Sequence, residues 1–324
     1  MAVNHVNLSN GEELIDLRHD TVTKDVLLKG YTAHGADGEP IVGEYEAESE
    51  SDVIASGSCG ENATWNFYND GRFVVSGSGK AEKSDEYSSI KNDVTTVIFE
   101  DGITEIGNWF CQNFESVVNV LVADTVDIIG ARSFAMCYSL ENIVLPNNMS
   151  MIGDYAFWQC SNLRSIVIPN GIISLEDSTF NSCISLKNVI LPESLKNIGA
   201  PFSDCSSLES MVIPEGVTEL LDGSFEGCSA LKSITIPKSV TLIESWAFYD
   251  CDSIETIYYA GTKEEWESIT IGDDNGSLLN ATLYCEYDPN ADTVDGWNVN
   301  VITDDSDVEN ITEPTITFMY TVGG

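Results

Sequence analysis

The stretch Phe157-Trp-Gln-Cys-Ser-Asn-Leu-Arg-Ser-Ile-Val-Ile-Pro169 decides the fold of this chain, because close copies of it recur every 22–23 residues. Each copy contains a phenylalanine followed three residues later by a cysteine. A copy just before the first full repeat keeps this spacing, but the two residue types are exchanged, as Cys111 and Phe114. A fixed period of this length predicts a solenoid in which each repeat forms one coil. The paired phenylalanine and cysteine of the six full repeats form the expected core column: Phe134/Cys137, Phe157/Cys160, Phe180/Cys183, Phe202/Cys205, Phe225/Cys228 and Phe248/Cys251.

Each repeat carries the pattern of a short strand. Apolar residues stand six and eight positions after the cysteine, as Ile166 and Ile168 do, and this alternation is typical of a half-buried strand. Pro169 follows, and a proline without an N–H ends the strand. Steps such as Ile152-Gly153 predict a turn back toward the core. We therefore expect a right-handed repeat solenoid with one strand per coil, stacked as a parallel sheet.

The pattern resembles the BspA-like leucine-rich repeats, also called the Treponema pallidum type. The segments Ile152-Gly-Asp-Tyr-Ala-Phe-Trp-Gln-Cys160 and Leu163-Arg-Ser-Ile-Val-Ile-Pro169 match the coil of that family closely. Ser56–Trp65 resembles its N-terminal cap, and Tyr258–Trp266 resembles its closing segment. The resemblance covers about residues 53–287 and implies a leucine-rich-repeat-like solenoid with β-rich caps at both ends.

The sequence divides into five parts. The strand patterns of Thr64–Tyr68 and Arg72–Val75, joined by Asn69-Asp70-Gly71, predict a hairpin within the N-terminal cap. Strand-like alternation also occurs in Trp297–Thr303 and Thr315–Val322, after the repeats. The expected parts are an N-terminal anchoring and assembly segment (1–50), an N-terminal β cap (53–92), the solenoid (93–260), a C-terminal cap (261–287) and a C-terminal β extension (288–324).

Residues 1–50 differ from the repeats. Within them, Asp20–Gly43 resembles an N-terminal segment of tailed-phage and prophage virion proteins, but Gly35 stands where an acidic residue is expected. Leu14–Leu17 predicts a short strand, and Gly30–Gly43 predicts a hairpin. The resemblance implies an anchor to other virion proteins, capsid or tail. Its candidate apolar residues are Leu14, Leu17, Leu27, Leu28, Tyr31, Ile41 and Tyr45.

The charge of the chain limits its partners. It has 53 acidic and 14 basic side chains among 324 residues, for a formal net charge of −39. Phosphate neutralisation needs lysine and arginine, so we expect no nucleic acid partner, and an anionic membrane surface is disfavoured for the same reason. The first residues lack the features of a signal peptide, and no stretch approaches transmembrane length. We expect no membrane insertion, synthesis in the host bacterial cytoplasm, and a location in the virion.

The stacked cysteines are expected to be buried thiols. Their Cα atoms would fall within disulfide distance, but nearly parallel Cβ vectors suit the S–S dihedral poorly. Cysteine packs well as a small apolar side chain. The redox state of Cys59 and Cys285, which lie in the caps, stays open.

No catalytic motif accompanies the repeats. The histidines, His5, His19 and His34, all precede them, so no coil can pair a cysteine with a histidine base. No zinc motif is present. The acidic loops Asp273–Gly276 and Asp304–Asp307 could bind calcium, but neither fits the EF-hand spacing, and solvated loops are the favoured interpretation. We expect no enzyme activity, no catalytic residue, no metal and no cofactor.

A stripe of residues seven positions after each cysteine should point outward, between the two buried positions. Two interpretations of its apolar character stay open. One is strand propensity, and the other is a contact face for another chain or a ligand, since a continuous exposed apolar strip is unusual. The outer stripe consists of Leu121, Val144, Val167, Ile190, Val212, Thr235 and Tyr258.

These features lead to one main functional hypothesis. The chain would be a non-enzymatic phage virion structural protein (head fibre, capsid decoration or tail fibre), anchored by residues 1–50. Its solenoid would be displayed for binding to a host-surface protein or glycan, and we expect a homo-oligomer. The alternative is a BspA-like bacterial cell-surface adhesion protein, as the repeat resemblance implies.

Overall fold

The structure is a computed structural model that describes residues 5–7, 13–16, 32–34, 40–42 and 53–287. The chain divides into two compact units. One consists of Glu50–Glu286, and the other combines Met1–Ser49 with Tyr287–Gly324.

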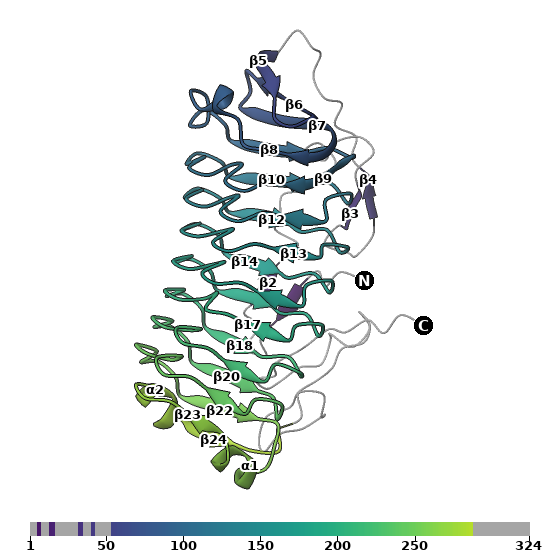
Figure 1. The fold of residues 1–324 in the computed structure, drawn as a ribbon. Coiled ribbons are helices and arrows are strands. Elements are labelled where there is room, and N and C mark those ends of the chain that lie inside the picture. Colours follow the sequence, from purple (N-terminus) through teal and green to yellow (C-terminus); the bar gives the residue numbers. More distant parts are fainter. Residues whose placement is uncertain (1–4, 8–12, 17–31, 35–39, 43–52, 288–324) are drawn as a thin grey trace, which may run out of the picture. The chain divides into compact units, whose positions relative to one another are not determined.

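The larger unit is a parallel β-solenoid of about nine coils, with about 23 residues per coil (Figure 1). The predicted strand of each coil is present and contributes to a first column of strands. Wherever consecutive members are hydrogen-bonded, they pair in parallel. The members are β8 (Thr96–Phe99), β10 (Asn119–Val122), β12 (Asn142–Val144), β14 (Ser165–Val167), β16 (Asn188–Ile190), β18 (Ser210–Val212), β20 (Ser233–Ile236), β22 (Thr256–Tyr259) and β24 (Thr282–Tyr284).

The prediction of one strand per coil is wrong, because a second column of short strands also runs along the solenoid. Most of these strands have two residues, too few to produce a visible alternation in the sequence. In the step Ile152-Gly153, the isoleucine ends such a strand and the turn begins only at the glycine. The second column is β9 (Ile103–Ile106), β11 (Ile128–Ile129), β13 (Met151–Ile152), β15 (Ser174–Leu175), β17 (Asn197–Ile198), β19 (Glu219–Leu220), β21 (Leu242–Ile243) and β23 (Thr270–Ile271).

An antiparallel cap starts both columns. Strand β6 (Asn62–Tyr68) pairs with β5 (Val53–Ser58) and with β7 (Arg72–Ala81), which confirms the predicted hairpin. The first half of β7 pairs with β8 and its last residues pair with β9. A short 3-10 helix, η3 (Asp85–Tyr87), follows. One long strand therefore sets the register of both parallel columns.

Two short helices close the other end of the solenoid. Helix α1 (Lys263–Glu267) begins with a capping box in which Thr262 and Glu265 exchange hydrogen bonds. Helix α2 is Gly276–Leu279. Neither helix was predicted, although a threonine three residues before a glutamate is a known signal of a helix start.

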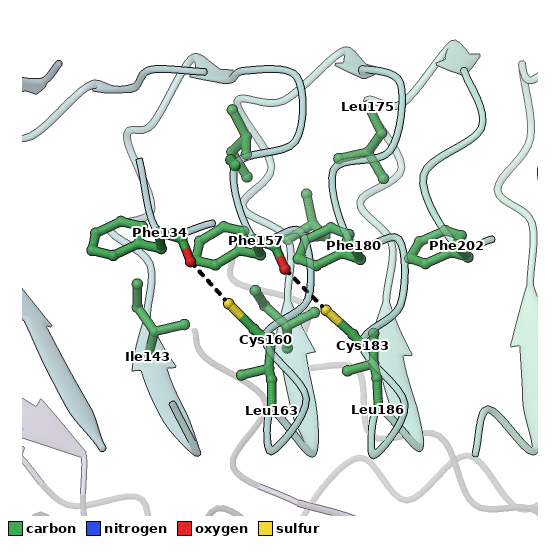
Figure 2. Close-up of a cluster of buried hydrophobic side chains, with 14 of the residues drawn as sticks. Phe134, Ile143, Phe157, Cys160, Leu163, Leu175, Phe180, Cys183, Leu186 and Phe202 are labelled. Atoms are coloured by element: carbon green, nitrogen blue, oxygen red, sulfur yellow. Dashed lines mark hydrogen bonds between the residues drawn. The ribbon is translucent and has the colours of Figure 1, made fainter. Parts of the chain in front are cut away.

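The phenylalanine rings stack face to face along the core (Figure 2). The ring centroids of Phe157 and Phe180 are 5.4 Å apart with an interplanar angle of 3°. Each thiol of the next coils points back along the axis and donates to a carbonyl, as Cys183 Sγ does to Phe157 O at 3.1 Å. In the exchanged repeat, the carbonyl of Cys111 accepts from Cys137 Sγ. The exchange therefore leaves this ladder unbroken.

A further hydrogen-bond ladder runs through the turns that carry these phenylalanines. Alternate N–H groups of one coil donate to carbonyls of the next, as Phe134 N does to Ala156 O and Met136 N does to Trp158 O. Left-handed backbone accompanies this alternation, as at Arg132 with φ of 58° and Met136 with φ of 60° in one coil and at Gln159 with φ of 58° in the next. All the donors point toward the C-terminal end, which therefore needs a cap.

The smaller unit contains two antiparallel pairs among its described residues. Strand β1 (His5–Asn7) pairs with β2 (Glu13–Asp16), at the strand predicted from Leu14–Leu17. Strand β3 (Thr32–His34) pairs with β4 (Pro40–Val42), which confirms the hairpin predicted there. Of the candidate anchor residues, Leu14 and Ile41 lie on β2 and β4. The other anchor residues and the two strand-like segments after residue 288 lie outside the described residues.

Candidate functional site

The outer stripe forms a line across the first strand column, because its residues are register partners on adjacent strands. Leu121 is paired with Val144, and Val167 with Ile190. Farther along, Thr235 is the register partner of both Val212 and Tyr258.

Exposure varies along the outer stripe. Val144 is 57% exposed and Val212 is 37% exposed, while Leu121, Val167, Ile190 and Tyr258 are half-buried. Thr235 is the exception, because it keeps the register position of the stripe but only 8% of it is exposed, so the structure corrects its expected exposure. It is a smaller residue in register with Tyr258, and the exposed line is interrupted at this point.

The apolar line extends beyond the residues chosen from the repeats. Tyr284 on β24 is in register with Tyr258, and their rings stack with centroids 5.7 Å apart. Sequence reasoning missed Tyr284 because its segment lacks the phenylalanine and cysteine markers. The alternation in Thr282-Leu-Tyr284 was the available signal.

Polar and charged residues border the outer stripe. The position two residues earlier on each strand is small and polar, as in Ser165 on β14. One position before that, oppositely charged side chains follow one another. Glu209 lies 3.6 Å from Lys187 and 3.4 Å from Lys232. Exposed pairs of this kind add little stability, but they keep basic groups on this face of a strongly acidic chain.

The thiols of the cysteine column are poorly suited to act as nucleophiles. Burial raises the pKa of the Cys183 thiol to about 12 and raises the pKa of Cys160 well above its usual range. Thiols with such pKa values stay protonated at neutral pH and are poor nucleophiles. The six cysteines of the core column are free and buried, which confirms their prediction as buried thiols, and Cys59, Cys111 and Cys285 are free as well.

Among residues 53–287 and the four short strands before them, no group of three or more metal-ligating side chains is found. The acidic loop at Asp273 proves to be a structural cap instead. The Asn275 side chain is buried and hydrogen-bonds to the backbone of Glu244 and Phe248 in the preceding coil and of Gly272 at the start of the loop. Within the same part of the chain, no helix has the length and apolar content needed to cross a membrane.

Stacked coils with one Leu-x-x-Ile-x-Ile-type strand each define a leucine-rich repeat protein. More specifically, the chain belongs to the BspA-type leucine-rich repeat family. The model described as "BspA type Leucine rich repeat region" matches residues 84–201 and 199–271 in six copies, which is more than half of the chain. Repeats of this type are generally non-enzymatic scaffolds for binding or adhesion. No curated protein matches the chain.

Several solved structures are similar to this chain. The T. pallidum leucine-rich repeat protein TpLRR is 23% identical, with a TM-score of 0.48, over 74% of this chain and 98% of that chain. A leucine-rich cell surface protein from Faecalibacterium prausnitzii A2-165 is 18% identical, with a TM-score of 0.33, over 68% and 98%. A leucine-rich repeat protein from Bacteroides ovatus ATCC 8483 is 23% identical, with a TM-score of 0.35, over 70% and 78%.

Proposed function

We propose that this chain is a non-enzymatic binding protein whose solenoid presents the outer stripe to a partner macromolecule. The observation that carries the proposal is the recurrence of outward apolar side chains on one strand after another, with Leu121 in register with Val144 and Val167 in register with Ile190, bordered by small polar and charged residues. An apolar strip with a polar border is the usual anatomy of a protein interface. Strand propensity alone does not require valine or isoleucine to face outward in one coil after another.

The test replaces Val167 and Ile190 with glutamate together. Both side chains are half-buried on the outer face, so the change should spare the core and remove binding. The partner is first captured with a photo-crosslinking residue at Asn188, beside the outer stripe. Binding of that partner to the double variant is then measured.

The matched control is Thr218→Glu with Thr241→Glu, which adds the same charge at exposed positions just before the second strand column. The proposal expects the control to bind like the natural chain and the stripe variant to lose binding at least tenfold. Undiminished binding by a folded stripe variant would refute it.

We further propose the virion as the setting, with the chain acting as a head fibre, capsid decoration or tail fibre anchored by residues 1–50. The support is the resemblance of Asp20–Gly43 to virion proteins. Cell-surface adhesion is the alternative, supported by membership of the BspA-type family.

The virion and cell-surface proposals differ in whether they expect the chain to form a homo-oligomer. The mass of the full chain in solution is compared with that of a variant lacking residues 1–50. An oligomer that becomes a monomer on truncation supports the anchored fibre. A monomer in both cases removes self-assembly from the proposal and favours the adhesion protein.

A further inference from the structure

One coil of the solenoid holds a guanidinium group on an aromatic pair. The guanidinium carbon of Arg132 lies 4.3 Å from the ring centroid of Tyr155 and 5.7 Å from that of Trp158. The two rings, 6.0 Å apart, meet edge to face. Contacts of this length are cation–π interactions. Here an arginine of one coil thus binds to two aromatic residues of the next coil.

The same aromatic pair recurs four coils later. Trp246 stands two residues before Phe248, as Tyr155 stands before Phe157, and Tyr249 stands at the place of Trp158. The rings of Trp246 and Tyr249 lie 4.5 Å apart, and Trp246 is 41% exposed. The repeat therefore presents a second aromatic pair at an equivalent position on the solenoid surface.

The residue equivalent to Arg132 is Gly223, which stands two residues before Phe225. The backbone is left-handed at both positions, with φ of 58° at Arg132 and 71° at Gly223. The backbone path is therefore shared, while the guanidinium that covers the first aromatic pair has no counterpart at the second among the residues that the structure describes. A guanidinium group from another molecule can take the same place.

Acidic side chains flank the position that lacks the arginine, since a Cβ at Gly223 would lie 3.5 Å from Glu226 Oε2. Asp222 and Glu226 stand where the first pair has Ala131 and Ala135. Partial burial and the nearby carboxylates of Asp204, Asp222 and Asp250 raise the pKa of Glu226. The coil of Gly223 thus has two carboxylates where the coil of Arg132 has two alanines, and it has a glycine in place of the arginine.

We propose that Trp246 and Tyr249 form a binding site for an arginine side chain of a partner protein, with the carboxylates of Asp222 and Glu226 beside it. Tryptophan and tyrosine are the residues that dominate the energetics of protein interfaces. An arginine suits the site because its planar group both stacks on rings and pairs with carboxylates. This surface is separate from the outer stripe, and the proposal does not depend on the stripe.

The experiment uses the full chain with 5-fluorotryptophan in place of tryptophan, observed by fluorine NMR at about 0.15 M salt. The Trp246 signal is assigned with Trp246→Phe. The probes are hexaarginine and its neutral analogue hexacitrulline. We expect hexaarginine to shift the Trp246 signal saturably and hexacitrulline to leave it unchanged. Absence of a saturable shift with hexaarginine would overturn the proposal.

Two variants separate this site from general attraction to an acidic protein. Gly223→Arg recreates the Arg132 arrangement, so it should shift the Trp246 signal without any peptide and weaken hexaarginine binding about tenfold. Arg132→Gly uncovers the first pair and should make the Trp158 signal respond to hexaarginine. If Gly223→Arg and Tyr249→Ala both bind the peptide as the natural chain does, only diffuse charge attraction is present and the site does not exist. The double glutamate variant of the outer stripe should still show the Trp246 shift.

Discussion

Asn275 Oδ1 accepts a hydrogen bond from the backbone N–H of Phe248 across 2.9 Å. In each earlier full repeat, the N–H of the core phenylalanine donates to a backbone carbonyl of the next coil, as Phe225 N does to Ala247 O. The Asn275 side chain replaces that carbonyl at the last full repeat. Its amide nitrogen donates to the carbonyls of Glu244 and Gly272. One buried side chain therefore ends the turn ladder of the solenoid.

Asn275→Ala should destabilise the solenoid by about 2–3 kcal/mol, because it removes the acceptor of the buried Phe248 N–H and the donor to the carbonyls of Glu244 and Gly272. Urea unfolding followed by circular dichroism measures this loss. Asn280→Ala, at an exposed position a few residues later, is the control and should change the stability by less than about 0.5 kcal/mol. Equal effects of the two changes would contradict the capping role.

The buried thiols should make the solenoid sensitive to alkali. Burial raises the pKa of Cys137, Cys183 and Cys251 to about 12, from an ordinary value of 9.0. Above pH 9 the unfolded chain ionises these thiols while the folded chain keeps them protonated. Their stabilising contribution is complete below pH 9 and declines between pH 9 and 12. Each thiol should add a slope of about 1.4 kcal/mol per pH unit in that window.

The thiol contribution is isolated by comparing the natural chain with Cys160→Ala/Cys183→Ala. The double variant should be less stable at pH 7, because two small cavities are created. Its unfolding free energy should then fall less steeply between pH 9 and 10. The slope should be smaller by an amount that corresponds to the release of up to two protons on unfolding. Identical slopes would mean that other groups, not these thiols, control the alkaline transition.

The stabilising effect of ring stacking should depend on whether a phenylalanine has one or two stacking partners. Phe180 stacks on Phe157 at 5.4 Å and on Phe202 at 5.7 Å, whereas Phe248 stacks on Phe225 at 5.2 Å and ends the described stack. Each aromatic pair is worth about 0.5–1.5 kcal/mol beyond area burial. Phe180→Leu should therefore cost about 0.5–1.5 kcal/mol more than Phe248→Leu in urea unfolding. A smaller cost at Phe180 would show that the rings act only as apolar volume.

The repeat predicted the core of the fold because each coil must bury the same positions against its neighbours. Spacing alone was enough to place Phe157, Cys160 and Ile166 inside. The second strand column escaped prediction because a strand such as Met151–Ile152 is too short to show a period of two. The turn ladder escaped it because left-handed backbone at Arg132 or Tyr155 has no signal in residue type.

The two candidate surfaces likewise differ in how far they could be predicted from the sequence. The outer stripe follows from the strand period, and the structure changes it only at Thr235 and by the addition of Tyr284. The arginine site of Trp246 was not visible in the sequence. It depends on comparing one coil with another in three dimensions, since Arg132 contacts residues 23 and 26 positions later in the chain.

Left-handed positions occupied by larger residues offer a last test of the turn ladder. Gln159 has a φ of 58°. The equivalent residue three coils later is Gly227, which has a φ of 72°. Alanine and glycine both remove the glutamine side chain, but only glycine adopts this backbone without steric cost. Gln159→Gly should therefore be more stable than Gln159→Ala by about 1 kcal/mol. The control is Ala135→Gly, which should be destabilising, because Ala135 is not among the residues with positive φ. If glycine and alanine were equivalent at position 159, the left-handed turn would not be part of the solenoid in solution.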